Sequence, residues 1–246
     1  MVNENKVSFK VYGKNALFSD PITRMGGEKC SYPIPTYQAL KGIIESVYWK
    51  PTIIWVVDRV RIMNPIQMES KGIRPITLSG GNTLSVYTYL NNVEYQVEAH
   101  FEWNENRPNL ANDRNENKHF FMAKRFIEKG GRRDIFMGTR ECQAYVEPCV
   151  FGEGEGYYDD KGDLTFGLMF HGFTYPDEVK AEHKGMLTAR FWSPMMKNGV
   201  VNFIKPKECT IQRELYEMQM KDFSKENNNF TGLGEFSENE FGGDDI

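Results

Sequence analysis

Apolar and polar residues alternate in two stretches of the chain, and this period of two predicts half-buried β-strands. KVSFKVY at residues 6–12 shows the pattern over a short distance. VEYQVEAHFEW at residues 93–103 shows it more strongly, with an apolar side chain at every second position. We expect the apolar side of this strand to face a core and its polar side, which includes His100, to face solvent. TIIWVVDRVRI at residues 52–62 predicts a third strand, whose apolar start indicates burial on both faces.

Apolar residues at helical spacing predict two helices. Thr36 can cap the first helix, and Pro51 prevents its continuation. Asn115 can cap the second helix, which Gly130 ends, and RRDIFMG then begins another strand. The apolar faces consist of Leu40, Ile43, Ile44 and Val47 in the first helix, and of Phe120, Ala123 and Ile127, flanked by Met122 and Phe126, in the second.

The order of these elements predicts the fold. It reads β-α-β followed by β-α-β, which is typical of a ferredoxin-like (RRM-like) domain. Residues 64–92 are rich in proline and glycine breakers and predict an inserted loop or hairpin. We therefore predict an α+β protein with a ferredoxin-like domain at residues 1–144 and a smaller β-rich domain, a β-sheet C-terminal part, at residues 145–210. Residues 211–246 complete it as an acidic, partly disordered tail.

The charge of the chain is distributed unevenly. Its formal net charge is −4, but residues 211–246 contain nine acidic and three basic residues. Residues 118–140, in contrast, contain seven basic and two acidic residues. Because the acidic tail hides this basic patch from the total, the bulk charge does not exclude a nucleic-acid partner.

Other sequence features narrow the class of protein. The N-terminal MVNENKVSFK lacks the apolar core of a signal peptide, and no run approaches the roughly 20 apolar residues of a membrane span. We expect a cytoplasmic protein with reduced thiols, no membrane partner, no metal and no cofactor. The cysteines show no CxxC spacing, and with the histidines they form no zinc-binding pattern. They are Cys30, Cys142, Cys149 and Cys209, and the histidines are His100, His119, His171 and His183.

Lys118 and His119 stand in the first turn of the second predicted helix. A phosphate-binding site is expected there, because the free N–H groups, the helix dipole and the lysine all favour an anion. The same field favours the neutral form of His119, which can accept a proton near neutral pH. We expect the pair to be presented at the mouth of the helix, where metal-free RNA cleavage would need a base, a cation and an acid.

Structural explanations compete with this chemistry. A Lys-His pair on a helix can be a solvated pair without function, and His171 in MFHGF is expected to be structural. The aromatic residues of the 93–103 strand are expected to be core rather than a platform for bases. A metal-dependent nuclease would need clustered carboxylates, and NDRNE and YYDDKGD have no spacing that matches such a site.

Several long segments resemble one family, the CRISPR-associated Cas-five proteins of the type I-C (Dvulg) subtype in the RAMP superfamily. The resemblance extends over nearly all of residues 5–205. It implies a ferredoxin-like RAMP domain followed by a smaller β-sheet domain. The segments are ALFSDPITRMGGEKCSYPIPTYQALKGIIESVYWKPT (16–52), IQMESKGIRP (66–75), NRPNLANDRNENKH (106–119), KGGRRDIFMGTREC (129–142) and MFHGFTYPDE (169–178).

The resemblance also implies an activity and a catalytic trio. Members of this subtype are endoribonucleases that cut the CRISPR repeat transcript at the base of its hairpin without metal, through attack of the 2′-hydroxyl that leaves a 2′,3′-cyclic phosphate. The family's catalytic residues match Tyr48 in ESVYWKP and Lys118 and His119 in ENKHF. We expect His119 to transfer protons, Lys118 to stabilise the phosphorane charge, and Tyr48 to orient or deprotonate the 2′-hydroxyl.

The resemblance further implies partners. They are the repeat RNA hairpin, whose 5′ handle stays bound, and the other subunits of the type I-C surveillance complex, with target DNA as a further candidate. The glycine-rich loop typical of the superfamily corresponds to KGGRRDIFMG. We expect RNA contacts from Lys124, Arg125, Lys129, Gly130, Gly131, Arg132, Arg133 and Arg140.

Two rival functions stay open. The first is a non-catalytic assembly subunit that holds the RNA handle and leaves cutting to another enzyme. The second is a metal-dependent DNase. The three expected catalytic residue types argue against the first rival, and the lack of a carboxylate cluster in the sequence argues against the second.

Overall fold

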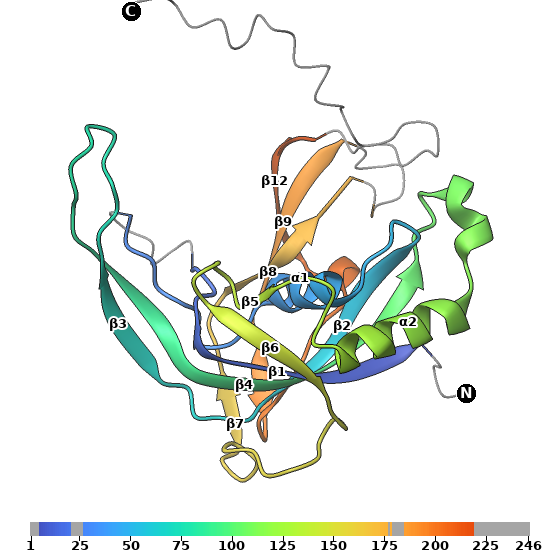
Figure 1. The fold of residues 1–246 in the computed structure, drawn as a ribbon, viewed down its shortest axis with the longest axis horizontal. Helices are drawn as coiled ribbons and strands as arrows, with labels where there is room; N and C mark the ends of the chain where they lie inside the picture. The colour runs from blue at the N-terminus through green and yellow to red at the C-terminus, as the bar shows by residue number, and fades with distance from the viewer. Residues whose placement is uncertain (1–4, 21–26, 177, 179–184, 219–246) are drawn as a thin grey trace, which may run out of the picture.

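The computed structural model describes residues 5–20, 27–176, 178 and 185–218 (Figure 1). These residues form a mixed α/β protein that is rich in strands and has two α-helices, α1 (Tyr37–Val47) and α2 (Glu116–Glu128). Short 3-10 helices occupy Pro108–Asp113 and Pro206–Glu208. The strands are β1 (Lys6–Ala16), β2 (Ile53–Ile62), β3 (Met68–Ile73), β4 (Ser85–Trp103), β5 (Ile135–Phe136), β6 (Gln143–Pro148), β7 (Asp163–Thr165), β8 (Met169–Thr174), β9 (Met186–Trp192), β10 (Met195–Lys197), β11 (Val200–Asn202) and β12 (Ile211–Glu217).

A nine-stranded sheet forms the centre of the molecule. Its strands follow the order β5-β6-β1-β4-β2-β11-β10-β7, and β3 pairs with β4 beside this path. The four central strands β6, β1, β4 and β2 are antiparallel to their neighbours. The strands predicted at 6–12 and 52–62 are confirmed as β1 and β2. Val97 of β4 lies between Phe9 of β1 and Val60 of β2, so alternation in the sequence becomes one continuous apolar surface.

The two helices cover this apolar surface. Thr36 caps α1 by accepting a hydrogen bond from the Ala39 N–H at 3.1 Å, and Asn115 caps α2 by accepting from the Lys118 N–H at 3.0 Å. Both predicted caps are therefore confirmed. α1 packs on β2, and α2 packs on β6 and β1 (Figure 1). The buried side chains of both helices and of the central strands belong to one hydrophobic core.

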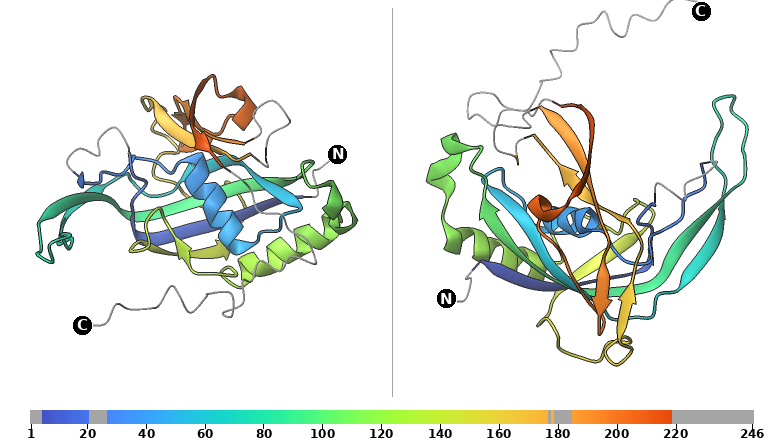
Figure 2. Two further views of the ribbon diagram at one scale, coloured as in Figure 1. Left: turned by 90° about the horizontal axis from the view of Figure 1, so that it is seen from above. Right: turned by 180° about the vertical axis from the view of Figure 1, so that it is seen from behind.

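The long strand β4 extends beyond the predicted strand at 93–103. It begins at Ser85 and pairs with β3 from Met68 opposite Leu90 to Ile73 opposite Ser85. The hairpin predicted within residues 64–92 is thus confirmed, but its second strand runs without a break into the central sheet. Figure 2 shows this hairpin curving away from the rest of the molecule.

The polar side of β4 is solvated only in part, because its middle is buried while Glu102 is exposed. Glu98 is 8% exposed and Gln96 is 5% exposed. The loop that follows β6 covers Gln96, which donates to the Glu153 carbonyl at 2.7 Å and accepts from the Gly152 N–H at 2.8 Å. This loop is far away in sequence, so the alternation of β4 alone could not reveal it.

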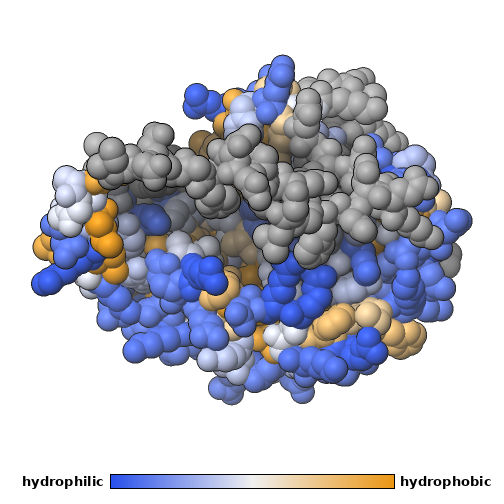
Figure 3. All heavy atoms as spheres, turned by 45° about the horizontal axis from the view of Figure 1, so that its top comes forward, coloured by the Kyte–Doolittle hydropathy of each residue, from blue (hydrophilic) through white to orange (hydrophobic). Residues whose placement is uncertain are grey.

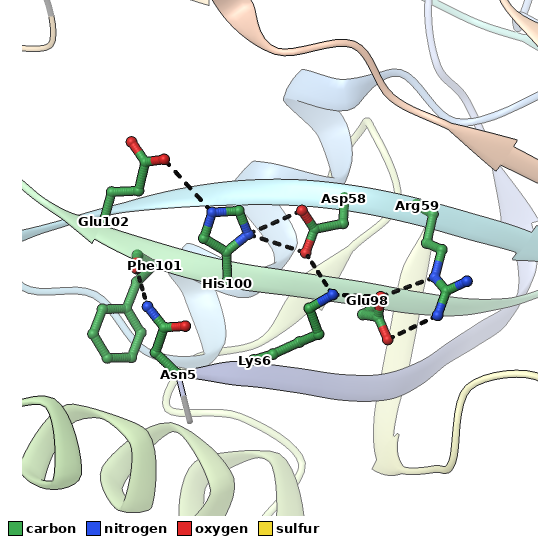
Figure 4. A network of polar contacts seen from close by, with 8 residues as sticks. All are labelled: Asn5, Lys6, Asp58, Arg59, Glu98, His100, Phe101 and Glu102. Carbon is green, nitrogen blue, oxygen red and sulfur yellow. Dashed lines mark hydrogen bonds and ion pairs between the residues drawn. The ribbon is translucent and has the colours of Figure 1, made fainter. Parts of the chain in front are cut away.

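Paired charges occupy this covered surface (Figure 4). Arg59 donates two hydrogen bonds to the Glu98 carboxylate, at 2.8 and 3.1 Å, and Lys6 donates to Glu98 at 3.1 Å. His100 Nδ1 lies 2.9 Å from the Asp58 carboxylate, which raises the pKa of His100. Ion pairing therefore compensates the partial burial of these side chains.

A second, three-stranded sheet contains β12, β9 and β8 in that order. His171 of β8 is fully buried, stacks on Tyr37 of α1 with 4.4 Å between ring centroids, and donates from Nε2 to the Ile204 carbonyl at 3.0 Å. These contacts fit the structural role expected for His171. They also fix the second sheet against the first helix.

Strands from residues 145–210 contribute to both sheets, and the predicted division into domains stays a prediction. β7, β10 and β11 join the large sheet, whereas β8 and β9 join the small one. The first residues of the predicted acidic tail form β12, and residues 219–246 lie outside the described part of the chain. Among the described residues, no helix combines the length and apolarity that crossing a bilayer requires.

Candidate active site

Tyr48 occupies the junction between α1 and the strand that follows it. It is the C-terminal cap of α1, and its N–H donates to the Ile44 carbonyl at 2.8 Å. Its own carbonyl accepts from Trp55 Nε1 at 2.7 Å, which ties the cap to β2. The ring stacks on Phe126 of α2 with 5.9 Å between centroids. These contacts hold the phenol rigidly between the two helices.

His119 lies opposite Tyr48, in the first turn of α2. The Tyr48 hydroxyl oxygen is 2.8 Å from His119 Nδ1, and His119 Nε2 is 2.9 Å from the Asp113 carbonyl oxygen. A carbonyl can only accept, so Nε2 carries the proton in the neutral ring. Nδ1 is then the acceptor, and Tyr48 donates to it. The structure thus brings together two residues that stand 71 positions apart in the sequence.

Both rings of this pair are buried, which corrects the expectation that the imidazole is presented at the helix mouth. His119 is 0% exposed and Tyr48 is 2% exposed. His119 shares the inward face of α2 with Ala123 and Ile127, because residues four apart lie on the same side of a helix. Lys118, one position earlier, points outward and is exposed.

Burial also sets the protonation of the pair. It is the main cause that lowers the pKa of His119, and the nearby charges of Lys118 and Lys50 lower it further. Burial likewise raises the pKa of Tyr48 to about 12. The imidazole is therefore neutral and the phenol protonated near neutral pH. The sequence predicted the neutral imidazole from the helix N-terminus, whereas desolvation is the larger cause.

Asp113 is a site residue that the sequence analysis missed. Its carboxylate accepts from Lys118 Nζ and, at 2.8 Å, from Thr52 Oγ1, and it lies 3.5 Å from His119 Nε2. Partial burial acts to raise the pKa of Asp113, but the hydrogen bonds from Lys118 and Thr52 lower it overall. In the sequence, Asp113 stands out only as part of NDRNE, a segment whose spacing does not match a metal site. Asp113 instead joins the lysine and the histidine of the predicted trio.

The predicted RNA-binding residues lie in three places. Lys124 and Arg125 lie on α2, and most of the others follow its end, where Gly130 and Gly131 have φ angles of 81° and 110°. A side chain at Gly131 would also meet Ile135 and the Arg133 carbonyl, so glycine is required for this turn. The turn leads directly into Arg132 and Arg133.

Arg132 belongs electrostatically to the site, because its charge acts against burial to lower the pKa of Tyr48. Arg140 lies apart from this loop, in the turn between β5 and β6. The basic side chains among the predicted RNA-binding residues are all exposed. Within the described ranges, no carboxylate forms an ion pair with any of them, which are Lys124, Arg125, Lys129, Arg132, Arg133 and Arg140.

The site offers little to a metal ion. Asp113 and His119 are adjacent, but His119 Nε2 donates to a carbonyl and Nδ1 accepts from Tyr48. In the part of the chain that the structure covers, no three His, Cys, Asp or Glu side chains are grouped to hold a metal. The groups that converge here are an imidazole, a phenol, an ammonium and one carboxylate, which are suited to proton transfer beside an anion.

Comparison with known proteins identifies the family. The family model Cas_Cas5d matches residues 7–204 of this chain. It describes the family as CRISPR-associated protein (Cas_Cas5). A protein of Mannheimia succiniciproducens named CRISPR pre-crRNA endoribonuclease Cas5d is 27% identical over 228 residues, which cover 80% of this chain and 94% of that protein. The protein of the same name from Thermus thermophilus is 29% identical over 179 residues, 67% of this chain and 74% of that protein.

A solved structure supports the same assignment. A crystal structure described as a CRISPR-associated protein aligns with a TM-score of 0.69 and 34% sequence identity, over 85% of this chain and 96% of the other. The strand-rich α/β architecture is therefore shared with this relative. Because the family model spans most of the sequence, the protein belongs to the CRISPR-associated protein (Cas_Cas5) family, the family that its sequence resembles.

Proposed function

We propose that the protein is an endoribonuclease that cuts CRISPR repeat transcripts at the base of their hairpin, without metal, to mature CRISPR RNA. It then holds the 5′ handle as a subunit of the cytoplasmic type I-C surveillance complex, near target DNA. The names of the two relatives support an RNA-cleaving role. The observation that carries the proposal is the 2.8 Å contact between the Tyr48 hydroxyl and His119 Nδ1, with Lys118 at the same helix start.

The geometry suggests how protons move in this reaction. A phenol whose pKa is about 12 stays protonated near neutral pH and can take up a proton only while it gives up its own, so Tyr48 and His119 act as a pair. The 2′-hydroxyl gives its proton to the Tyr48 oxygen while Tyr48 passes its own to His119 Nδ1. The 2′-oxygen then bonds to phosphorus and the bond to the 5′-oxygen breaks. The imidazolium supplies the proton that the departing 5′-oxygen takes, and the Lys118 ammonium stabilises the phosphorane.

Access to the buried pair requires a rearrangement at Asp113. Lys118 is bound to the Asp113 carboxylate, and the Asp113 carbonyl holds His119. A phosphate of the substrate would compete with the carboxylate for Lys118. Asp113 is the last residue of a short 3-10 helix, which is an element that can shift without disturbing the sheet. RNA binding therefore draws Lys118 away from the carboxylate, which lets Asp113 shift. The Asp113 carbonyl then releases His119, and the imidazole is exposed.

We also propose that the N-terminal part of the chain has a ferredoxin-like fold. Support comes from the order β1-α1-β2-β4-α2-β6 along the chain and β6-β1-β4-β2 across the sheet, with all neighbours antiparallel. This arrangement is two split β-α-β units that interlock. It brings the C-terminal end of α1 beside the start of α2, where Tyr48 and His119 meet.

One observation favours the rival function of a non-catalytic assembly subunit. Both nitrogens of His119 are occupied by internal partners and the ring is fully buried, so the site is closed without RNA. A subunit that only holds the handle would not need to open it. The assay below distinguishes the two functions.

The test is incubation of the pure protein with its cognate repeat RNA in EDTA. Wild type is expected to cut, and Tyr48→Phe to lower the rate by roughly 100-fold or more while RNA binding persists. Tyr37→Phe is the matched control, because Tyr37 is likewise a buried tyrosine but lies at the other end of α1 and stacks on His171. Binding without any product would favour the assembly subunit. Cutting of duplex DNA only after divalent ions are added would favour the DNase.

A further inference from the structure

The outward face of α2 carries an exposed aromatic ring. Phe121 is 63% exposed and lies on the side of the helix opposite the buried positions His119, Ala123 and Ile127. A single exposed apolar side chain is common on protein surfaces and needs no explanation by itself. The surroundings of Phe121 are what give it significance.

Phe121 lines a shallow, open groove on the surface of α2 together with two cations, and all the lining residues belong to α2 or its N-cap. A shallow cavity of about 510 Å³ runs along the start of α2, and Figure 3 shows hydrophobic side chains emerging among hydrophilic ones on this side of the molecule. The aromatic ring packs edge-on against Phe120, with 5.4 Å between centroids. The lining residues are Asn115, Asn117, Lys118, Phe121, Met122 and Arg125.

The cations stand on either side of the ring. Lys118 precedes Phe121 by three positions and Arg125 follows it by four, so both are its neighbours on the helix surface. The Arg125 guanidinium contacts the Met122 sulfur at 2.9 Å and lies 5.8 Å from the centre of the Phe126 ring, at the end of the groove nearer the middle of α2. An aromatic surface between two cations fits an unpaired nucleobase whose flanking phosphates meet the cations. The same pattern is poorly suited to an apolar protein partner, because the charges would be desolvated.

The groove is also continuous with the candidate active site. Lys118 lines the groove and is bound to Asp113, whose carbonyl holds His119. A nucleotide with its phosphate at Lys118 therefore places its neighbouring base within reach of Phe121.

We propose that Phe121, Lys118 and Arg125 form a subsite that stacks one unpaired nucleobase of the RNA, next to the phosphate that is cut. The subsite rests on the proposed endoribonuclease function and deepens it. It predicts that the enzyme requires a single-stranded nucleotide beside the hairpin base. The ring acts through its flat π face, so a base of any identity can occupy it.

The test measures RNA binding and cutting for substitutions at Phe121. Phe121→Ala is expected to weaken binding of the cognate repeat RNA by roughly 5- to 150-fold, the usual loss for one stacked base. Phe121→Trp should keep the affinity, and Phe121→Leu, apolar but not aromatic, should lose it. Tyr145→Ala is the control, since Tyr145 is a similarly exposed aromatic on β6. Binding is measured in the Tyr48→Phe background, so that the RNA stays intact.

A second set of RNAs locates the base. Each unpaired nucleotide beside the hairpin base is replaced in turn by an abasic one. At one position the abasic change should weaken binding by wild-type Phe121 but have no further effect on Phe121→Ala, as expected for two halves of one contact. Equal affinity of all Phe121 variants, or no coupled position, would overturn the subsite.

The outcomes separate the subsite from the nuclease. If wild type cuts and Phe121→Ala binds and cuts equally well, the subsite is wrong and the nuclease stands. If a coupled position is found but wild type cuts nothing in EDTA, the subsite stands and the nuclease is wrong. If Phe121→Ala binds RNA normally but no longer associates with the other complex subunits, the groove is a protein interface and the subsite is refuted.

Discussion

At the scale of single residues, Asp113 links the groups of the candidate active site. Its carboxylate binds Lys118 and Thr52, and its carbonyl fixes the tautomer of His119. The same carboxylate raises the pKa of His119, against the larger effect of burial. Asp113 thus positions both a cation and a base, although it need not touch the RNA.

Replacing Asp113 by asparagine should shift the pH dependence of cutting. The carboxylate favours protonated His119, so its loss lowers the pKa of His119 further, and activity that needs the neutral imidazole persists to lower pH. The measurement is the pH–rate profile of RNA cleavage. Glu105→Gln is the control, because Glu105 pairs with Arg114 in the same loop at 3.2 Å. An unchanged acidic limb in Asp113→Asn would show that Asp113 does not act on His119.

At the scale of elements, the two helix caps show what could be predicted from the sequence. Thr36 and Asn115 are each followed by helical spacing of apolar residues, and both signals are local. The hairpin in residues 64–92 was predictable too, because the proline and glycine breakers that indicate it are also local signals. The cover over the polar side of β4 was not predictable, because the loop after β6 that provides it is remote in sequence.

Asn115 supports the site as well as the helix. Asn115→Ala should destabilise the fold by about 1 kcal/mol, the usual cost of losing a cap, and should also slow cutting, because Lys118 and His119 occupy the first turn. Thr36→Ala removes the equivalent cap of α1, far from the trio, and should cost similar stability without slowing the reaction. Urea denaturation and single-turnover cleavage measure the two effects. If the two variants cut RNA at equal rates, the cap of α2 does not contribute to catalysis.

At the scale of the whole molecule, the closeness of Tyr48 and His119 depends on the topology of the sheet. Family resemblance located Tyr48, since nothing in its local sequence distinguishes it from a core aromatic. Its contact with His119 arises because α1, on β2, and α2, on β6 and β1, also pack against each other over the large sheet. Burial of the pair and the role of Asp113 depend on packing between distant segments, which no local pattern reveals.

The basic loop after α2 should carry much of the salt dependence of RNA binding. Arg132 and Arg133 are exposed, and no described carboxylate pairs with them. Replacing both by alanine should weaken binding and reduce the slope of log K against log salt by about 1 to 2. Lys205→Ala with Lys207→Ala is the control, because it removes the same charge from two exposed lysines, the N-cap of the 3-10 helix at Pro206–Glu208 and a residue within it. An unchanged slope in the arginine variant would place the loop outside the interface.

The most direct test of the proposed mechanism uses a repeat RNA with a single 2′-deoxy nucleotide on the 5′ side of the phosphate that is cut. In EDTA, the ordinary RNA should yield one fragment ending in a 2′,3′-cyclic phosphate and one beginning with a 5′-hydroxyl. The deoxy RNA should bind equally well and stay intact, because the attacking hydroxyl is missing. Undiminished cutting of the deoxy RNA would contradict internal attack and, with it, the roles assigned to Tyr48, Lys118 and His119.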